Sequence, residues 1–380
     1  MRVALVGPVY PYRGGIAHYT TMLNDELRRQ GHEVLLVSFN RQYPRWLFPG
    51  ASDRDPSQMI LHAEGAHYWI DSINPATWLY AFLKIAQYRP DIVVLQWWTT
   101  FWSLVWLTLG LLTRCVLRKP LVFICHNVLP HETRWWEPLL TSLVLNFGTG
   151  FVVQSSQEHT SLLRIIPKAR DAIVPTPIYA MFSDCTWSQE QARSHLGLEC
   201  DANVLLFFGI VRPYKGLEDL LYALPQICQQ LGKTRLIVAG EIWGDTRSYT
   251  DLVHELGLEP VVSFEDRYIP NEEIGMYFAA ADVLVAPYRH VTGSAVLQMG
   301  IGFGCPIITT RVGDAAKLAE GNPAIQLVEP GNRQELVQTI VQYFTQHSDS
   351  QQERKMGKDI SFTTWADLVR TIEELSGQCA

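Results

Sequence analysis

The chain has 380 residues, a length that predicts two domains, because single hydrophobic cores seldom grow beyond about 250–300 residues. Hydrophobic residues make up 47% and charged residues 18% of the chain, which excludes a disordered protein. The formal net charge is −7 and no long basic run is present, which argues against a nucleic-acid-binding protein.

Apolar runs rich in β-branched residues alternate with helical patterns in the first half of the chain. Ile16–Gln30 is predicted as an amphipathic helix that Gly31 ends. The predicted strands of this half are Val3–Pro8, Glu33–Phe39, Asp91–Gln96, Leu121–Cys125, Gly150–Gln154 and Ala172–Pro175. Strands that alternate with helices predict a parallel sheet with helices on both faces.

The segment Ile92–Thr113 contains no charged residue and is long enough to span a bilayer. We favour a buried strand, a turn at Trp97–Thr100 and a packed helix at Phe101–Leu117. Peripheral membrane contact is a second prediction, because aromatic and basic residues combine here as interfacial anchors do. The residues concerned are Trp97, Trp98, Trp102, Trp106, Arg114, Arg118 and Lys119.

The alternation stops at Ile173–Asp184, which holds two prolines and no helical period and is predicted to be a linker. A second series follows, with strands at Val204–Ile210, Arg235–Gly240, Val261–Phe264, Asp282–Pro287, Pro306–Thr310 and Ile325–Val328. Its predicted helices include Leu217–Leu231 and Asn271–Ala280, and the tail Phe362–Leu375 is a further amphipathic helix. The sequence therefore predicts an α/β protein with two Rossmann-like domains, 1–178 and 179–360, that face a cleft, followed by a terminal helix in 361–380. Ligands of such sheets bind beyond the carboxyl ends of the strands.

Gly14 and Gly15 follow the first strand and open the first helix, where backbone N–H groups favour an anion. The alternative is an ordinary βα turn. The motif is not GxGxxG, and no acidic residue ends the second strand, so a nicotinamide dinucleotide is disfavoured.

Arg212 and Lys215 lie three positions apart in the loop after the first strand of the second half. There, a guanidinium fork and an ammonium group can bind one diphosphate. The alternative is a solvated basic loop.

A third candidate site is the start of the helix that follows His290–Gly293. The backbone N–H groups of Ser294, Ala295 and Val296 would form an uncharged anion cradle. The alternative is a plain helix cap by Ser294.

His126 follows the strand Leu121–Cys125 and would enter the cleft from the first domain. His126, His131 and Glu132 could hold a metal, but the HxxxxH spacing in a proline-containing loop lacks the geometry of a helical zinc motif. Asp53-Arg54-Asp55 is read as a solvated loop and not as a metal site. Neither a GxSxG elbow nor a P-loop is present, which argues against a hydrolase triad or a kinase.

Taken together, these motifs resemble the retaining glycosyltransferases of family 4, which have the GT-B fold. The resemblance covers nearly the whole chain and depends on Gly14-Gly15, Gly31–Val34, HNVLPHE, Arg212–Gly216 and the block Ala281–Asp314. It implies sugar transfer from a nucleoside diphosphate sugar, without a metal or other cofactor. It also implies that Arg212 and Lys215 hold the diphosphate, that His126 contacts the donor sugar, and that the loop at Gly293–Val296 binds the distal phosphate. The terminal helix would return to the first domain.

The chain departs from the family at two positions. Many members carry two glutamates eight positions apart, where this sequence has Val291 and Met299. Gln298 is the nearest polar substitute for the ribose contact, and we count Gln298 and Tyr268 among the donor-binding residues.

We therefore expect a cytoplasmic hexosyltransferase of polysaccharide or glycolipid biosynthesis, whose second domain binds the donor and whose first domain binds a glycan or lipid-linked acceptor. The aromatic loop Tyr43–Gly50 and the tryptophans suggest contact with the inner face of the membrane. A GT-B epimerase and a nucleotide-sugar-binding protein without catalysis remain alternatives.

The seven scattered cysteines form no CxxC pair and fit a reducing compartment. The N-terminus turns to Gly and Pro too early for a secretory signal.

Overall fold

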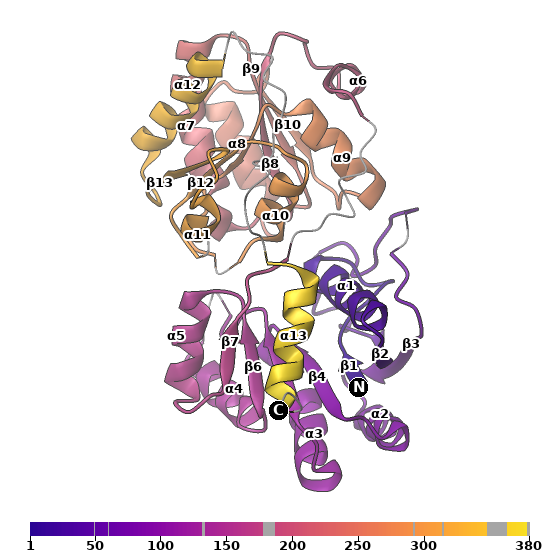
Figure 1. Ribbon diagram of the computed structural model, residues 1–380. Coiled ribbons are helices and arrows are strands. Elements are labelled where there is room, and N and C mark those ends of the chain that lie inside the picture. The colour runs from indigo at the N-terminus through magenta and orange to yellow at the C-terminus, as the bar shows by residue number, and fades with distance from the viewer. Residues whose placement is uncertain are drawn as a thin grey trace. The chain divides into compact units, whose positions relative to one another are not determined.

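The computed structural model describes residues 1–48, 50–59, 61–130, 134–177, 187–291, 293–313, 315–347 and 363–377. The chain divides into two compact units, each built on a parallel sheet (Figure 1). The N-terminal unit comprises Met1–Asp55, Ile60–Pro177 and Thr363–Ala380, and the C-terminal unit comprises Pro56–Met59 and Ile178–Phe362. The predicted fold class of two Rossmann-like α/β domains is confirmed.

The N-terminal sheet has seven parallel strands in the order β3-β2-β1-β4-β5-β6-β7. The strands are β1 (Arg2–Val6), β2 (Glu33–Arg41), β3 (Ala66–Asp71), β4 (Ile92–Trp97), β5 (Leu121–Cys125), β6 (Gly150–Val153) and β7 (Asp171–Ile173). The register pairs Val3 with Val34 on one side of β1 and with Ile92 on the other. The sequence analysis did not identify β3 or the helix that follows it.

The helices of the N-terminal unit form two layers. They are α1 (Gly15–Arg29), α2 (Pro75–Tyr88), α3 (Ser103–Leu112), α4 (Glu137–Leu145), α5 (Ser156–Ile165) and α13 (Trp365–Ser376), with a 3-10 turn η1 (Thr100–Trp102) and a π-helical turn η2 (Thr113–Leu117) on either side of α3. Val3 and Leu5 of β1 pack in the core that includes α1 and α13, whereas Ala4 and Val6 pack in the core that includes α2, α3 and α4. Because alternate residues of a strand point to opposite faces, a strand this apolar needs both layers.

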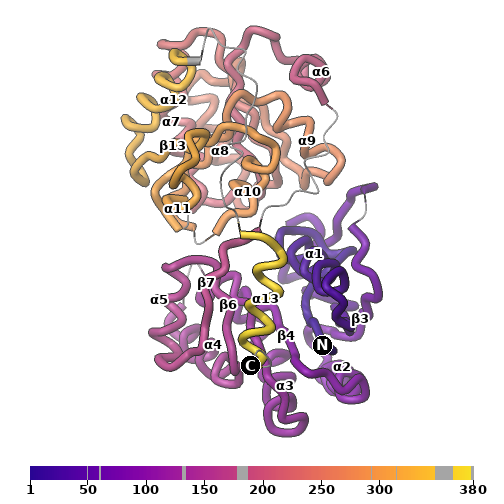
Figure 2. The backbone as a smooth tube through the Cα atoms, in the orientation of Figure 1, coloured from indigo at the N-terminus to yellow at the C-terminus, as the bar shows by residue number. Residues whose placement is uncertain are grey.

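The last helix, α13, packs against α1 and β6 of the N-terminal unit, as the tube in Figure 2 also shows. It begins with a capping box, in which Thr364 and Asp367 bond each other's backbone N–H groups. Leu368 and Ile372 are fully buried at this contact. The predicted return of the terminal helix to the first domain is therefore confirmed.

The C-terminal sheet has six parallel strands in the order β10-β9-β8-β11-β12-β13. The strands are β8 (Asn203–Phe208), β9 (Thr234–Ala239), β10 (Val262–Glu265), β11 (Val283–Ala286), β12 (Ile307–Thr310) and β13 (Ile325–Val328). The helices are α6 (Gln189–His195), η4 (Pro213–Lys215, a 3-10 turn), α7 (Leu217–Leu231), α8 (Thr246–Glu255), α9 (Asn271–Ala280), α10 (Ala295–Gly302), α11 (Ala315–Ala319) and α12 (Arg333–His347). The predicted bounds of α7 and α9 agree with the structure.

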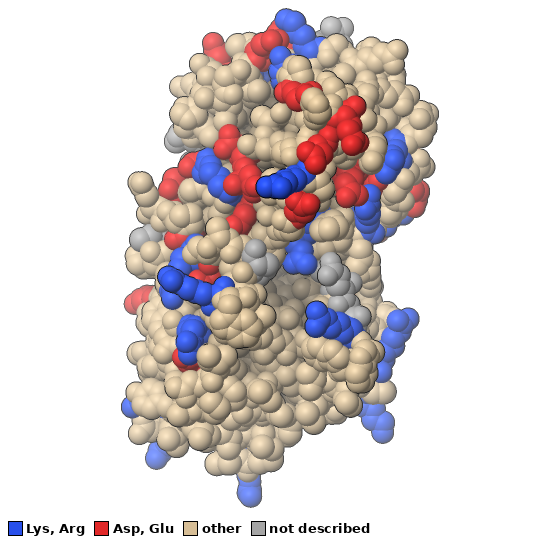
Figure 3. Space-filling model, turned by 180° about the vertical axis from the view of Figure 1, so that it is seen from behind, with Lys and Arg blue, Asp and Glu red and all other residues tan. Residues whose placement is uncertain are grey.

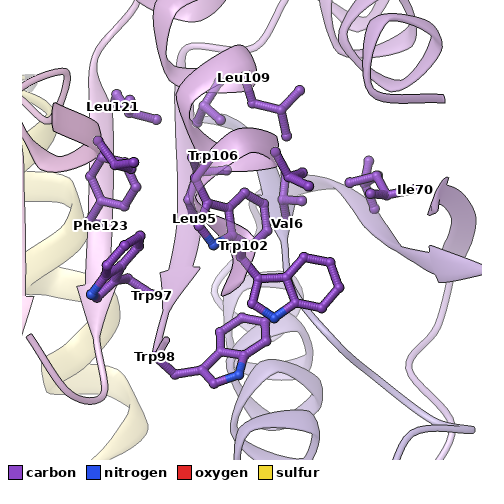
Figure 4. Packing of buried hydrophobic residues seen from close by; sticks show 14 of the residues in the cluster. Val6, Ile70, Leu95, Trp97, Trp98, Trp102, Trp106, Leu109, Leu121 and Phe123 are labelled. Atoms are coloured by element: carbon purple, nitrogen blue, oxygen red, sulfur yellow. The ribbon is translucent and has the colours of Figure 1, made fainter. Parts of the chain in front are cut away.

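The tryptophans that the sequence analysis assigned to a membrane surface lie in the core of the N-terminal unit (Figure 4). Trp97, Trp102 and Trp106 have no exposed surface, and Trp98 is 9% exposed. The rings of Trp98, Trp102 and Trp106 pack on one another and on Phe39. The prediction that these tryptophans are exposed anchors is wrong, because large aromatic surfaces are buried where a core can accept them.

One helical stretch among the described residues, Thr100–Leu117, is long and apolar enough to cross a membrane. This criterion uses only length and composition, and core helices of soluble proteins also meet it. Here Val105 and Leu109 are buried against the sheet of the N-terminal unit. The preferred prediction of a packed helix after β4 agrees with this arrangement.

Candidate functional site

The strand order of the C-terminal sheet reverses direction between β8 and β11. The chain leaves β8 toward β9 and leaves β11 toward β12, so the two loops diverge at the carboxyl ends of neighbouring strands. Ligands of open α/β sheets bind at such a point. The loop after β8 carries Arg212 and Lys215, and the loop after β11 leads to Ser294, so the topology brings these predicted residues to one place.

Backbone contacts hold these two loops together. The Arg289 N–H donates to the Tyr214 carbonyl oxygen over 2.8 Å. Gly216 has φ +73°, and a Cβ atom there would lie 2.0 Å from the Pro287 carbonyl oxygen. Only glycine fits this position, because a side chain would meet rigid backbone and the left-handed conformation disfavours other residues.

Lys215 is the most unusual charged group of this site. Its Nζ atom lies 5.8 Å from the centroid of the Tyr288 ring, and no residue that the structure describes in this unit forms a hydrogen bond or ion pair with it. Burial, and secondly the nearby Arg212, lower the pKa of Lys215 from 10.5 to about 8. Lys215 is half-buried, and removing a cation from water without a counterion is costly, which favours an anionic ligand at this position.

Because Gly209 has no side chain, a ligand can approach the Lys215 ammonium group close to the backbone of this residue. A Cβ atom on Gly209 would lie 3.2 Å from Lys215 Nζ and 3.0 Å from Val296 Cγ2, and Gly209 has φ +88°. The end of β8, the Lys215 side chain and the start of α10 therefore meet at one point.

The start of α10 is compatible with both interpretations of Ser294, as a helix cap and as part of an anion-binding site. Its side chain caps the helix by accepting from the Leu297 N–H at 3.3 Å, and Tyr288 Oη lies 3.1 Å from Ser294 Oγ. For the main-chain N–H groups of Ala295 and Val296, no acceptor is found within the described part of the chain. Such orphan donors at a helix N-terminus are suited to phosphate.

Arg212 lies among aromatic side chains. Its guanidinium carbon is 5.9 Å from the centroid of Tyr214 and 5.5 Å from that of Trp243. Trp243 in turn donates its indole N–H to the buried carboxylate of Glu241 at 2.7 Å. This packing restricts the side chain that was predicted to bind the diphosphate.

The remaining predicted residues of this unit are Gln298 and Tyr268. Gln298 is 2% exposed, and no partner for its Oε1 atom is found among the described residues. Tyr268 follows β10 at the edge of the sheet, two strands away from β8. Val291 and Met299 are 6% and 7% exposed, so the two positions at which the family resemblance implies glutamates are apolar and buried here.

The N-terminal sheet has its own change of direction between β1 and β4. Gly14 is the N-cap of α1, and no side chain caps this helix. The predicted diglycine therefore does open a helix beside this point, and its role as an anion site remains a prediction.

His126 follows β5 at the same edge of the N-terminal sheet, and both of its ring nitrogens are hydrogen-bonded. Gln154 Nε2 donates to Nδ1 at 2.9 Å, so Nε2 carries the proton and donates to Gln96 Oε1 at 2.7 Å. The Tyr19 ring packs edge-on against the imidazole at 4.8 Å between centroids. Burial lowers the pKa of His126 to about 3, so the ring is neutral at physiological pH.

The loop after His126 is fixed by a buried carboxyl group that sequence reasoning missed. Glu158 in the first turn of α5 is 3% exposed and accepts a hydrogen bond from the Val128 N–H. Burial raises the pKa of Glu158 to about 7, although the Val128 bond opposes the rise. Glu158 therefore anchors the loop that follows His126.

Asp53-Arg54-Asp55 packs on the loop between β1 and α1. The Asp55 side chain is 4% exposed and lies 3.7 Å from His18 Nε2 of α1. Arg54 lies over the Tyr12 ring at 4.5 Å. The interpretation of this segment as a solvated loop is wrong at Asp55, whose carboxylate is buried beside a basic group.

Within the described residues, no group of three or more His, Cys, Asp or Glu side chains could hold a metal ion. His131 and Glu132, which the sequence analysis weighed as ligands together with His126, lie outside the described residues.

Three site residues that were not predicted from the sequence have a feature in common, which is their position near the carboxyl end of a strand. Gln96 is the second-last residue of β4 and Gln154 follows β6, so each is a polar residue close to the carboxyl end of an otherwise apolar strand. Tyr288 lies two residues after β11. In a parallel sheet these positions lie at the ligand-binding edge, and a polar residue there is a functional candidate.

Comparison with known proteins agrees with this arrangement. The glycosyl transferase 4-like domain family matches residues 14–177, and the glycosyl transferases group 1 family matches residues 202–346. An uncharacterized glycosyltransferase of Methanocaldococcus jannaschii is 23% identical over 333 residues, which cover 82% of this chain and 81% of that protein. The lipopolysaccharide glucosyltransferase WaaG of Escherichia coli is 29% identical over 161 residues, and this match covers only 42% of each chain.

Among solved structures, that of the Anabaena protein HepE in complex with UDP has a TM-score of 0.70 at 16% identity and covers 100% of this chain and 98% of that chain. At this identity the likeness concerns the fold alone. The two matched domains lie in the two α/β units, in the same order along the chain. Each α/β unit therefore matches a glycosyltransferase domain family, and the fold is that of the GT-B glycosyltransferases.

Proposed function

We propose that the protein is a retaining, metal-independent glycosyltransferase of family 4. It transfers a hexosyl group from a nucleoside diphosphate sugar to a glycan or lipid-linked acceptor in polysaccharide or glycolipid biosynthesis. The C-terminal unit binds the donor, the N-terminal unit binds the acceptor, and the enzyme acts in the cytoplasm. The observation that carries the proposal is the Lys215 ammonium group, which is half-buried beside Gly209 and the start of α10 and has no counterion among the described residues.

The donor diphosphate supplies the missing counterion. Lys215 and Arg212 neutralise its charge, and the N–H groups of Ala295 and Val296 bind the distal phosphate. These groups stabilise the negative charge that develops on the leaving diphosphate, which is the principal requirement for breaking the glycosidic bond. HepE is described in complexes with UDP and UDP-glucose, which supports uridine diphosphate as the donor group to test first.

The acceptor proton requires no carboxylate base at Val291 or Met299. In a retaining reaction the departing phosphate takes the proton from the acceptor hydroxyl as that hydroxyl attacks the same face of the sugar. His126 is neutral and hydrogen-bonded at both ring nitrogens, so its role is to position the sugar and not to carry a proton.

The test is a screen of nucleotide sugars for nucleoside diphosphate release, with and without membrane lipid extract. Arg212→Ala and Lys215→Met are compared with Lys233→Met, a control that removes a 61%-exposed lysine from the same unit. We expect release to fall in the first two variants and to be unchanged in the third. Transfer that survives Arg212→Ala at saturating donor would contradict the diphosphate assignment.

The apolar, buried state of Val291 and Met299 favours one alternative, a nucleotide-sugar-binding protein without catalysis. Tight UDP binding without release from any donor supports that alternative. A GT-B epimerase predicts conversion of the donor sugar in the absence of any acceptor.

A further inference from the structure

The outward faces of three neighbouring helices in the N-terminal unit are apolar. α2 packs against α3, and α3 packs against α4. Their most exposed leucines are 43–72% accessible, although a helix packed on a core usually exposes polar residues on its outer side. We call this surface the leucine face; its members are Leu79 and Leu83 of α2, Leu104 and Leu111 of α3, and Leu139 and Leu143 of α4.

The spacing of these leucines makes each helix apolar on both sides. Each pair is separated by four or seven positions, so its two side chains lie on one side of the helix. The opposite sides carry Ile85, Trp106 and Val144, which are buried in the core of this unit. A surface helix normally places polar residues on its outer side. The leucine face is therefore unexplained by the core of this unit.

The exposed charged residues of these three helices all have one sign. The ranges 75–88, 100–117 and 137–145 contain a single acidic residue, Glu137, which is 7% exposed and accepts hydrogen bonds from Thr100 and the Arg134 N–H. Lys84 and Arg114 lie on the same helices, and the exposed Arg118 follows η2. Among the described residues these helices thus offer cations and no exposed carboxylate. Figure 3 shows that the visible side of the N-terminal unit also carries few carboxylates.

We propose that the leucine face docks on the surface of a lipid bilayer that contains anionic lipids. Leucine side chains enter the boundary between headgroups and acyl chains, and the neighbouring Lys and Arg bind the headgroups. A second copy of this chain fits less well, because two such faces would oppose like charges without a carboxylate to pair them. The helix Thr100–Leu117 does not span the bilayer, since Val105 and Leu109 belong to the protein core.

This proposal stands independently of sugar transfer and is tested without it. The full chain is sedimented with vesicles of phosphatidylcholine, with or without phosphatidylglycerol. Leu104→Gln/Leu139→Gln removes two members of the leucine face. The matched control Ile173→Gln/Tyr222→Gln removes two apolar side chains that are 39% and 46% exposed elsewhere. Thermal unfolding and UDP affinity, measured for each variant, verify that the fold and the donor site are intact.

We expect the wild type to bind the anionic vesicles, and the leucine-face variant to lose at least roughly tenfold in partition coefficient because two apolar side chains leave the membrane. The control should bind as the wild type does. Arg114→Gln/Arg118→Gln should weaken binding only to anionic vesicles and lower its salt dependence. The proposal is overturned if the wild type binds no vesicles, if the control loses as much as the leucine-face variant, or if light scattering shows that the substitutions only convert a dimer to a monomer.

Discussion

Lys215 allows a quantitative prediction, because its pKa places the loss of its charge within an accessible pH range. Burial and Arg212 lower this pKa from 10.5 to about 8 in the absence of ligand. The shift of about 2.5 units corresponds to about 3 kcal/mol that opposes the charged form. A bound diphosphate restores the charged form and raises the pKa, so only the ligand-free protein loses the proton between pH 8 and 9.

The expected consequence is a pH-dependent affinity for UDP. At pH 9 about one ligand-free molecule in ten retains the Lys215 proton, so the dissociation constant should be about tenfold higher than at pH 7. The phosphate group of UDP does not produce this change, since its last ionisation lies near pH 6. Lys215→Arg should remove the dependence, because a guanidinium remains charged throughout.

Isothermal titration calorimetry at pH 7, 8 and 9, in buffers of different ionisation enthalpy, measures both the affinity and the protons taken up. We expect uptake to approach about one proton per UDP at pH 9 in the wild type and none in Lys215→Arg. A constant wild-type affinity over this range, or an equal loss in Lys215→Arg, would refute the assignment of Lys215 as the diphosphate cation.

Three further predictions concern the same two sheet edges. Gly209→Ala places a methyl group 3.2 Å from Lys215 Nζ, on a residue with φ +88°. UDP affinity, measured by calorimetry, should fall at least roughly tenfold, and the free energy of unfolding, measured by urea titration, should fall by about 1–2 kcal/mol. Unchanged affinity would contradict a close approach of the ligand to this backbone. In the folded state Glu158 keeps its proton up to about pH 7, whereas in the unfolded chain its carboxyl group loses the proton near pH 4.5. Because the unfolded state binds fewer protons in this range, the free energy of unfolding should decrease as the pH rises from about 4.5 to 7. Glu158→Gln should remove up to about 3 kcal/mol of that decrease in urea titrations at pH 5 and 8, and an identical pH dependence in the variant would show that Glu158 is not its source. The pKa of His126 is lowered to about 3, so its imidazole should not titrate between pH 5 and 8 in nuclear magnetic resonance spectra. The His126→Asn variant identifies the imidazole signals of His126. An inflection near pH 6.5 would show that the ring is exposed to solvent.

The sequence determined the fold class because its local signals are strong. Strands such as Leu121–Cys125 are continuous apolar runs, as strands buried on both faces must be. The helix α7 has a clear apolar periodicity and ends at Gly232. Arg212, Lys215 and Ser294 could be proposed as one site because each follows a predicted strand, and parallel strands end at the same edge of a sheet. The weaker pattern of β3, with its exposed Tyr68, gave no such signal.

Only the tertiary structure decided which side chains are buried and which groups lack a partner. Trp102 and Trp106 looked like membrane anchors, yet they fill the core, while ordinary leucines such as Leu104 and Leu139 are the exposed ones. The sequence of α3 is apolar on all sides, so periodicity could not tell its inner face from its outer face. Likewise, Lys215 is one basic residue among many in the sequence. Its lowered pKa arises from burial among Gly209, Tyr288 and the start of α10, which strand order brings together from separate parts of the chain.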